Sequence, residues 1–331
     1  MSRPKCSRSC GIGGQAVLEG VMMKKGDLYA VTVRKPNGDL VIDTEEFHGV
    51  MHGSKIKKTP FIRGIFNFVD SLILGTRTLN YSAEFFEDES AKETKFDQWF
   101  KKIFKDKADG IVAGITVTLS IVLAIAIFMV LPYFISSLLD TFVRNSTILA
   151  VIEGIIRLAI FVGYVILISA MEDIKRVYMY HGAEHKCINC IERGRKLTVD
   201  NVMASSRLHK RCGTSFMLFV MLVSIILFMF IKVDNPIMRV VVRMLLVPVI
   251  AGISYEIIRL AGNNSNNIFV KIISAPGMWL QTLTTKEPTT DMVEVAIKSV
   301  EAVFDWKEYL KEEFGYSDEW MEEEEEISSE S

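Results

Sequence analysis

Three of the five histidines in this 331-residue chain stand close together in the sequence. Residues 181–185 read His-Gly-Ala-Glu-His, an H-x-x-E-H pattern. On a helix, His181 and His185 lie one turn apart on one face, with Glu184 beside them. Two such imidazoles can bind one divalent metal ion, and the carboxylate can be a third ligand or the base that takes a proton from water. Pairs of histidines at this spacing are also common on solvated helices. The neighbouring residues must therefore show whether this pair binds a metal ion.

Further candidate ligands stand in the segment His209-Lys-Arg-Cys212, which opens an apolar run. Imidazole and thiolate are both ligands that zinc accepts. We expect one divalent ion, zinc, bound by His181, His185 and His209, with Glu184 as a further ligand or as the base. Cys212 is a candidate for completing the site. Glu184 is the candidate catalytic residue of this set. Four strong protein ligands including Cys212 would make the site structural, whereas three leave a position for water.

The cysteines allow a rival assignment. Cys187 and Cys190, followed by His209 and Cys212, form a CxxC…HxxC set that is compatible with a structural zinc knuckle. A third interpretation gives Cys187 and Cys190 no role beyond that of small loop residues. The odd number of cysteines, five, argues against a disulfide framework and for reduced thiols or metal ligands.

The elements that carry these residues belong to a membrane protein. Half of the residues are hydrophobic, and residues 110–139 contain no Asp, Glu, Lys or Arg. Such a run is longer than a helix needs to cross a hydrocarbon core of about 30 Å. This pattern excludes a mainly disordered or a purely soluble protein. We predict four transmembrane helices, at 110–139, within 146–171, at 213–231 and within 237–261.

Basic residues in the connections predict the orientation of the chain. The connection 172–212, the loop with the metal motif, holds nine Lys and Arg, whereas 140–145 holds one and 232–239 holds two. By the positive-inside rule, 172–212 is cytoplasmic, and with four spans both termini are cytoplasmic as well. The lipid bilayer is the expected partner, and no nucleic acid is expected.

The rest of the chain supplies smaller elements. Residues 28–34 and 39–44 flank Pro36-Asn37-Gly38, and Asn-Gly between two β-rich runs predicts a hairpin. We predict an N-terminal cytoplasmic β-containing region (1–58), an amphipathic interfacial or re-entrant helix (59–86), a charged linker (87–109), the four-helix bundle (110–261), an interfacial segment at 268–283 with one C-terminal amphipathic helix at 290–314 (together 262–314), and an acidic tail (315–331). The fold class is therefore an α-helical polytopic membrane protein with a small β-hairpin region.

Charged residues occur within the predicted spans. Glu153 and Arg157 stand four residues apart, and Arg243 and Glu256 lie in the fourth span. Such charges are usually paired or reach the membrane surface, but they are costly enough that a functional role competes. They motivate a small transporter as an alternative, which the four spans and the absence of an evident internal repeat in the sequence weaken.

Ordered short motifs along the chain are similar to those of a known family. They are Gly13-Gly14-Gln15-Ala16-Val17, Glu19-Gly20-Val21-Met22-Met23, Arg63-Gly64, Ser71-Leu72-x-Leu74-Gly75, Ser82-Ala83, His181-Gly-Ala-Glu-His-Lys186, His209-x-Arg-Cys-Gly-Thr-Ser-Phe216, Tyr255-Glu256 with Arg259, Pro276-Gly277 and Leu280-Gln281-x-Leu283-Thr284-Thr285-x-Glu287-Pro288. The chain resembles the YqhQ-type bacterial membrane proteins, domain of unknown function 1385, described as predicted metal-dependent enzymes. The resemblance covers roughly residues 11–304, and Cys187 and Cys190 fall outside its motifs.

The resemblance implies a metal-dependent enzyme in a bacterial plasma membrane. A hydrolase acting at the cytoplasmic membrane face on a membrane-linked substrate fits the motifs, with Arg63, Arg211 and Arg259 as candidates for binding an anionic substrate group. The alternative is a non-enzymatic assembly or scaffold protein, in which the metal only fixes the 172–212 loop to the third span. A metal with an open coordination position would favour the enzyme, whereas a metal with four protein ligands would favour the scaffold protein. A homo-oligomer is compatible with either.

Overall fold

The computed structural model describes residues 9–86, 108–143, 145–231, 233, 235–263 and 268–317. The chain forms two compact units, one from residues 1–86, 165–220 and 248–331 and the other from 87–164 and 221–247. Most of the predicted linker, residues 87–107, and most of the predicted tail, residues 318–331, lie outside the described part.

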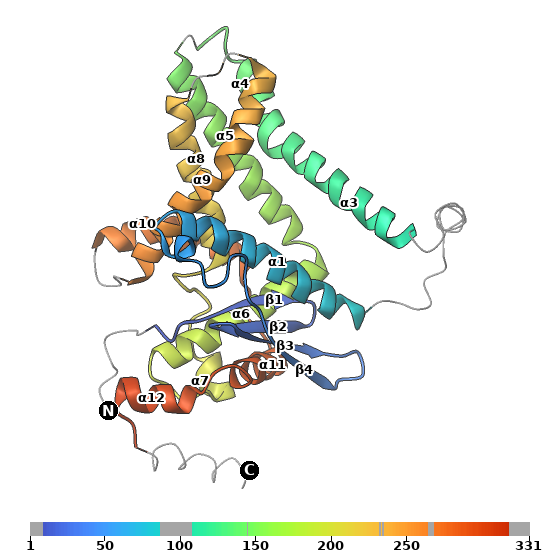
Figure 1. Cartoon of the computed structure of the whole chain (residues 1–331), viewed down its shortest axis with the longest axis vertical. Coiled ribbons are helices and arrows are strands. Elements are labelled where there is room, and N and C mark those ends of the chain that lie inside the picture. The colour runs from blue at the N-terminus through green and yellow to red at the C-terminus, as the bar shows by residue number, and fades with distance from the viewer. Residues whose placement is uncertain are drawn as a thin grey trace. The chain divides into compact units, whose positions relative to one another are not determined.

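The first unit contains a four-stranded antiparallel sheet in the order β1-β2-β3-β4 (Figure 1). Its strands are β1 (Ile12–Val17), β2 (Gly20–Lys25), β3 (Leu28–Arg34) and β4 (Leu40–Glu46). The predicted hairpin at Pro36-Asn37-Gly38 is confirmed, since β3 and β4 pair on either side of it and Gly38 has a φ of 91°. The first two strands were not predicted, because glycine-rich segments have a low propensity for strands.

Helices of the first unit cover both faces of this sheet, and further helices pack around them. The helices of this unit are η1 (Lys55–Lys58), α1 (Ile62–Glu84), α6 (Glu172–Glu192), α7 (Val199–Met203), α10 (Ile268–Thr284), α11 (Thr290–Glu301) and α12 (Trp306–Phe314). Helix α1 lies on one face of the sheet, and α6 and α11 lie on the other. The prediction of one helix over 290–314 is wrong, because the chain breaks after α11 and restarts at Asp305. The side chain of Asp305 caps α12 by accepting a hydrogen bond from the Glu308 amide at 2.9 Å.

The alternation of side chains along the strands builds two apolar layers. On one face, Val21, Met23 and Ala30 pack with α6 and α11 in a buried core. On the other face, Val31 and its neighbours pack on Leu74 of α1. Figure 1 shows the sheet between α1 and the pair α6 and α11. Segments far apart in the sequence thus form one three-layered body.

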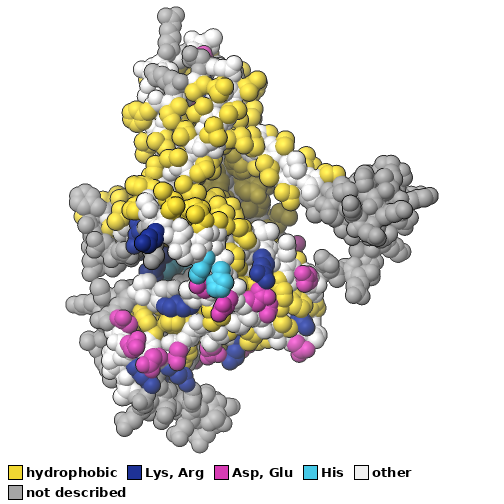
Figure 2. All heavy atoms as spheres, in the orientation of Figure 1, with side chains coloured by type: hydrophobic (Ala, Val, Ile, Leu, Met, Phe, Trp, Pro, Cys, Tyr) yellow, Lys and Arg dark blue, Asp and Glu magenta, His cyan; other side chains and the backbone are white. Residues whose placement is uncertain are grey.

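The helices long and apolar enough to cross a membrane agree with the four predicted spans. The candidate spans are Gly114–Ser137, Ser146–Ile168, Gly213–Phe230 and Ile237–Leu260. They are formed by α3 (Ala108–Ile125), η3 (Ala126–Val130) and α4 (Leu131–Ser137), by α5 (Ser146–Ile168), by α8 (Gly213–Phe230) and by α9 (Pro236–Asn263). Many large apolar side chains along them face outward, as lipid-facing surfaces require (Figure 2).

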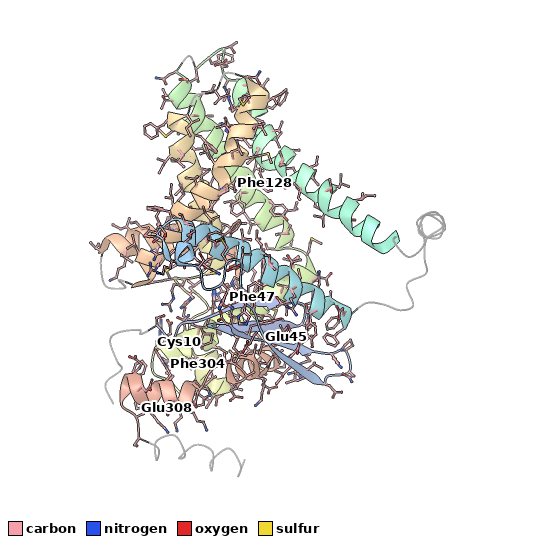
Figure 3. The ribbon with its side chains drawn as sticks, in the orientation of Figure 1. Cys10, Glu45, Phe47, Phe128, Phe304 and Glu308 are labelled. Atoms are coloured by element: carbon pink, nitrogen blue, oxygen red, sulfur yellow. The ribbon has the colours of Figure 1, made fainter. Side chains whose placement is uncertain are left out.

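The first of these spans changes its helical geometry near a proline. Residues Ala126–Val130 form a π-helical turn immediately before Pro132, which lies in the first turn of α4. Proline has no backbone N–H to donate, so the regular α-helical pattern is interrupted there. Phe128, which lies in this turn, is labelled in Figure 3. Its ring packs edge-on against those of Phe161 and Tyr164, with centroid distances of 6.4 and 5.7 Å.

The four charged residues named above in the predicted spans are paired. Glu153 accepts hydrogen bonds from Arg157 and Arg243, each at 2.9 Å, and all three side chains are buried. In the first unit, Glu256 accepts a hydrogen bond from Nε of Arg63 on α1 at 2.6 Å. These ion pairs give the intramembrane charges a structural role and leave the transporter alternative without support from them.

Candidate metal centre

One face of α6 carries the residues that could bind a metal ion or transfer a proton. The helix places side chains three, four, seven and eleven positions apart on the same side. The residues on this side are His181, Glu184, His185, Ile188 and Glu192. The opposite side carries the core residues Tyr180, Ala183, Cys187, Cys190 and Ile191. The H-x-x-E-H segment is therefore helical, as its spacing predicts.

The structure brings His181, His185 and Cys212 together. One potential ligand atom of each lies within 4.8 Å of those of the other two. Sγ of Cys212 is 3.3 Å from Nε2 of His181, and the two imidazole rings are 4.4 Å apart between centroids. Two imidazoles and one thiol are a ligand set that suits zinc.

The outer nitrogen of each imidazole is held by a backbone carbonyl. Nδ1 of His181 is 3.0 Å from the carbonyl oxygen of Thr284, and Nδ1 of His185 is 2.7 Å from that of Arg207. A carbonyl only accepts, so each Nδ1 donates its proton outward. The Nε2 atoms are left to face the ligand cluster. Metal-binding histidines are usually oriented in this way.

Electrostatics favour a thiolate in this cluster. Burial alone would raise the pKa of Cys212, but the neighbouring imidazoles of His181 and His185 hold that pKa well below its usual range. The same contact raises the pKa of His181 to about 9, against the effect of its burial. With no metal bound, these opposite shifts favour a thiolate on Cys212 and a protonated imidazole on His181. The thiolate is the form of cysteine that binds metal.

Glu184 lies beside the three ligands. Its carboxylate oxygen is 3.9 Å from Nε2 of His181, and its side chain is only 6% exposed. Burial raises its pKa, and the imidazoles of His185 and His181 partly oppose this effect. A buried carboxylate with a raised pKa is suited to accept and return a proton near neutral pH.

A cavity of about 100 Å³ opens onto the cluster. Its walls come from α6, from the segment around Cys212 and from β1. They are formed by Ile12, Gly13, Gly14, His181, Glu184, His185, Ile188, His209, Arg211, Cys212 and Gly213. The cavity has room for a few water molecules but is smaller than pockets that enclose a whole organic ligand.

The glycines of β1 allow the strand to form this wall. A Cβ atom at Gly14 would lie 2.8 Å from Cγ of Glu184 and 2.8 Å from the carbonyl oxygen of Met22. Only glycine permits such a close approach. At Gly13 a Cβ would meet nothing within 4 Å. Sequence reasoning did not connect this segment with the site, because its only signal is the absence of side chains.

His209 lies next to the cluster but is not part of it. Its Nε2 is 3.3 Å from the Glu192 carboxylate, and its ring centroid is 5.8 Å from that of His185. Burial would raise the pKa of Glu192, but the contacts with His209 and Arg211 lower it below its ordinary value. Gln281 holds the backbone of His209, accepting from its amide at 2.9 Å and donating to its carbonyl at 2.7 Å.

The three arginines with an expected substrate role lie in different places. Arg211 lines the cavity and forms an ion pair with Glu192. Arg63 is paired with Glu256, and Arg259 is exposed. Neither Arg63 nor Arg259 lines the cavity. The geometry therefore leaves Arg211 as the arginine that can meet a group bound beside Glu184.

The structure does not form the zinc knuckle. Cys187 and Cys190 are completely buried in the apolar core, on the side of α6 away from Cys212. Sγ of Cys190 donates to the carbonyl of Lys196 at 3.2 Å. Burial raises the pKa of Cys190 to about 12 and that of Cys187 well above its ordinary value, so both remain thiols.

Two further segments hold the ligands in place. Lys186 donates to the carbonyls of Met203 and Ser205 at 2.8 and 2.9 Å, which fixes the loop whose Arg207 carbonyl holds His185. A Cβ at Gly182 would lie 2.0 Å from the carbonyl oxygen of Lys286. The glycine therefore lets the segment after α10 pack tightly on α6, which brings the Thr284 carbonyl to His181.

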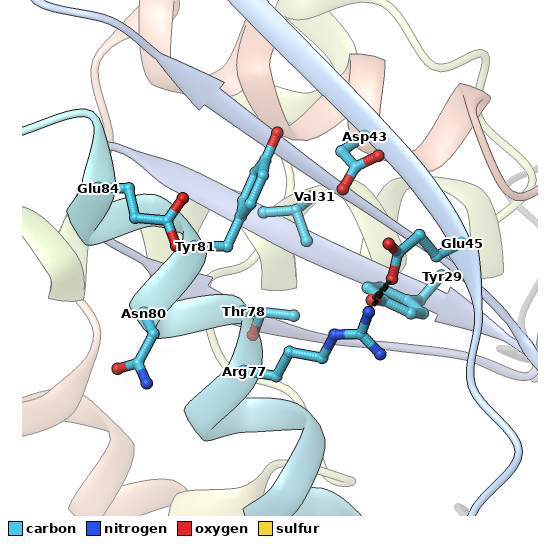
Figure 4. A pocket seen from close by; sticks show the side chains of 9 residues that line it. All are labelled: Tyr29, Val31, Asp43, Glu45, Arg77, Thr78, Asn80, Tyr81 and Glu84. Atoms are coloured by element: carbon cyan, nitrogen blue, oxygen red, sulfur yellow. Dashed lines mark hydrogen bonds and ion pairs between the residues drawn. The ribbon is translucent and has the colours of Figure 1, made fainter. Parts of the chain in front are cut away.

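A larger hollow of about 280 Å³ lies elsewhere in the first unit, between the β3–β4 hairpin and α1 (Figure 4). Arg77 reaches across it to Glu45 at 2.6 Å, and the hydroxyl of Tyr29 also donates to Glu45. Neither histidine nor cysteine lines it. Its central charges already pair with each other, so the smaller cavity at Glu184 is the better candidate for chemistry.

Comparisons with known proteins agree with the motifs of the sequence. The family described as a protein of unknown function (DUF1385) matches residues 59–306. A relative described as the uncharacterized protein YqhQ of Bacillus subtilis (strain 168) is 37% identical over 292 residues, which is 87% of this chain and 90% of the relative. No solved structure matches. The family match includes every candidate ligand but not the glycines of β1.

Proposed function

The chain belongs to the DUF1385 family and has four helices long and apolar enough to cross a membrane, and we propose that it is a metal-dependent hydrolase with zinc bound by His181, His185 and Cys212. The observation that carries the proposal is the convergence of three donors. One potential ligand atom of each of His181, His185 and Cys212 lies within 4.8 Å of the other two, while both Nδ1 atoms are held by carbonyls. Such an arrangement fits the binding of a tetrahedral metal ion better than it fits a metal-free hydrogen-bonded cluster of the two imidazoles and the thiol.

The number of ligands favours catalysis over a purely structural role. Three protein donors leave the fourth position of a tetrahedral zinc site for water, and a cavity lies directly beside them. Zinc bound there would supply Lewis acidity and a lowered pKa for that water. A structural site would instead need a fourth protein ligand. Glu184 is the nearest candidate, and this proposal assigns it to proton transfer, whereas His209 is turned toward Glu192.

The side chains around the cavity have distinct roles in this proposal. Glu184 accepts the proton of the attacking water and returns it to the leaving group. Arg211 places a positive charge at the cavity wall for an anionic substrate group. Glu192 orients both His209 and Arg211. The raised pKa of Glu184 supports its role in proton transfer.

The size of the cavity and the position of its ligands in the chain limit the substrate. Only water and the reacting group fit within about 100 Å³, so the remainder of the substrate lies outside. Cys212 directly precedes the candidate span Gly213–Phe230, and α6 begins shortly after the span Ser146–Ile168. Because two spans end near the ligands, we place the reaction at the membrane surface, on the cytoplasmic side by the distribution of basic residues. A membrane-linked ester, phosphoester or amide is the substrate class.

The test compares Glu184→Gln with the wild type, both purified in detergent without an affinity tag. Zinc content per chain is measured first, and hydrolysis is then followed on a panel of lipid-linked esters, phosphoesters and peptides. We expect unchanged zinc and a rate lower by roughly 10²–10⁴-fold. Glu172→Gln, an exposed change at the start of α6, is the matched control. Equal rates for Glu184→Gln and wild type would exclude the role of Glu184.

A second candidate function follows from the same pair of residues. A thiolate 3.3 Å from an imidazole whose other nitrogen is held by a third group is also the arrangement of a cysteine nucleophile. A nucleophilic Cys212 would need no metal. Activity that persists after chelation and is lost on alkylation of Cys212 would favour this candidate, whereas activity lost on chelation and restored by zinc supports the hydrolase.

A further inference from the structure

The remaining two histidines form a second cluster, far from α6 in the sequence. His48 and His52 follow β4, and Asp27 lies in the turn between β2 and β3. One potential ligand atom of each lies within 4.8 Å of those of the other two. The side chains are 54%, 53% and 51% exposed, respectively. Figure 2 shows histidine side chains at the surface beside acidic ones.

The spacing of the three side chains is close to that of metal ligands. Nδ1 of His48 and Nδ1 of His52 are 3.8 and 3.9 Å from the same carboxylate oxygen of Asp27. These separations are too long for hydrogen bonds. Donors bound at about 2.0–2.2 Å to one tetrahedral ion lie roughly 3.3–3.6 Å apart. Small rotations of three exposed side chains would therefore bring all three donors onto one ion.

A fourth residue selects the nitrogen of His48 that would bind. Oε2 of Glu46 is 3.3 Å from Nε2, on the other side of the His48 ring from Asp27. A carboxylate at this distance favours the His48 tautomer that carries its proton on Nε2, which leaves the lone pair on Nδ1, facing Asp27. A carboxylate behind a histidine in this way is the usual support of a metal ligand.

The backbone that carries the cluster is fixed by the fold. The amide of Phe47 donates to the carbonyl of Asp27 at 2.8 Å, which continues the β3–β4 pairing and sets Asp27 beside the end of β4. Beyond it, the amide of Val50 donates to Asp70 of α1 at 2.7 Å, and the amide of His52 donates to the carbonyl of Gly49 at 3.1 Å. The turn thus returns His52 to the side of His48.

We propose that Asp27, His48 and His52 form a second site, which binds a divalent transition metal such as zinc or cobalt. Two imidazoles disfavour magnesium and calcium, and the carboxylates of Asp27 and Glu46 supply charge that attracts a cation. The site has no thiolate and is open to solvent, so it exchanges its metal more readily than the centre on α6. It does not depend on the proposed hydrolase activity.

Cobalt(II) distinguishes the two sites, because only a thiolate ligand gives an intense sulfur-to-cobalt charge-transfer band. The full-length chain, untagged and in detergent, is titrated with cobalt and followed by absorption and calorimetry. We expect two ions per chain, one with the charge-transfer band and one without it. The double variant His48→Ala and His52→Ala should lose only the second, whereas Cys212→Ser should lose the band and keep the second.

Two single substitutions sharpen the test. Glu46→Gln should weaken binding at the second site by roughly 10–100-fold without abolishing it. Asp39→Asn, at the exposed β3–β4 turn, removes a carboxylate outside the cluster and should leave the titration unchanged. Wild-type stoichiometry in the double histidine variant, or a single thiolate-bound ion in the wild type, would overturn the proposal. Binding at the second site without a charge-transfer band anywhere would instead contradict the centre on α6 alone.

Discussion

Gly14 of β1 lies directly against Glu184 of α6, so that a Cβ atom at residue 14 would be 2.8 Å from Cγ of the glutamate. The contact joins the first strand of the sheet to the metal motif, although the two are far apart in the sequence. It also makes the strand a wall of the cavity at His181 and Cys212. The sheet is therefore part of the candidate site and not a separate appendage.

Gly14→Ala should disturb the site through Glu184. The added methyl group also meets the carbonyl of Met22 at 2.8 Å and Sδ of Met23 at 2.9 Å, so β1 must move away from α6. Inserting a methyl group into a packed interior costs about 1–3 kcal/mol. We expect a lower unfolding temperature and less zinc per chain, measured by thermal unfolding in detergent and by elemental analysis. Gly13→Ala, where a Cβ meets nothing within 4 Å, should match the wild type in both.

Zinc content should follow the geometry of the ligands. We expect near one zinc per chain in the wild type after dialysis, and loss of that zinc in Cys212→Ser and in the double variant His181→Ala and His185→Ala. His209→Ala should retain it, because that imidazole is turned toward Glu192. Cys187→Ala is the control for removing a buried thiol from the same helix. Zinc lost with His209 and kept without Cys212 would show that the ligands rearrange on binding.

Metal binding should release one proton near neutral pH. Below a pKa of about 9, His181 is protonated in the metal-free protein and must lose its Nε2 proton to bind zinc. Cys212 is already a thiolate there, because its pKa is well lowered. Zinc affinity should therefore rise about tenfold per pH unit from pH 7 toward 9.

Calorimetry in buffers of different ionisation enthalpy measures the protons released on zinc binding. Cys187→Ala should behave as the wild type. Release of two protons at pH 7 in the wild type would mean that Cys212 is a thiol in the free protein.

Apolar runs and helical spacing in the sequence predicted the membrane helices and the helix of the metal motif. The apolar runs are long enough to define the four spans without tertiary information, and three- to four-residue spacing placed His181, Glu184 and His185 on one face. The Asn37-Gly38 turn likewise predicted its hairpin, because its backbone requirement is local. Each of these features depends on residues close together in the chain.

Features that depend on tertiary packing could not be predicted in this way. The sequence favoured His209 over Cys212 as the third ligand, but in the structure His209 is turned toward Glu192 and Cys212 lies against His181, which spacing does not show. Strands β1 and β2 were missed because their glycines are explained only by what packs against them. Gln281 forms hydrogen bonds with both backbone groups of His209, and neither the amino-acid composition nor the spacing of residues predicts this role.

The ion pairs within the spans predict that two substitutions, one at Glu153 and one at Arg243, differ in their effect on stability. Glu153 accepts from Arg157 and Arg243, and both guanidinium groups also lie over the ring of Phe228, 5.3 and 4.8 Å from its centroid. The cluster thus holds two positive charges and one negative charge in an apolar bundle. Glu153→Gln leaves both arginines without a counter-charge, which should cost about 3–5 kcal/mol.

Arg243→Gln has the opposite effect on charge, because it leaves the neutral pair Glu153–Arg157. We therefore expect Arg243→Gln to be clearly less destabilising than Glu153→Gln, although both remove one ion-pair partner. Thermal unfolding in detergent measures the order, with the exposed change Glu172→Gln as control. If Arg243→Gln were as destabilising as Glu153→Gln, the stacking of its guanidinium on Phe228, and not charge balance, would dominate the stability of the bundle.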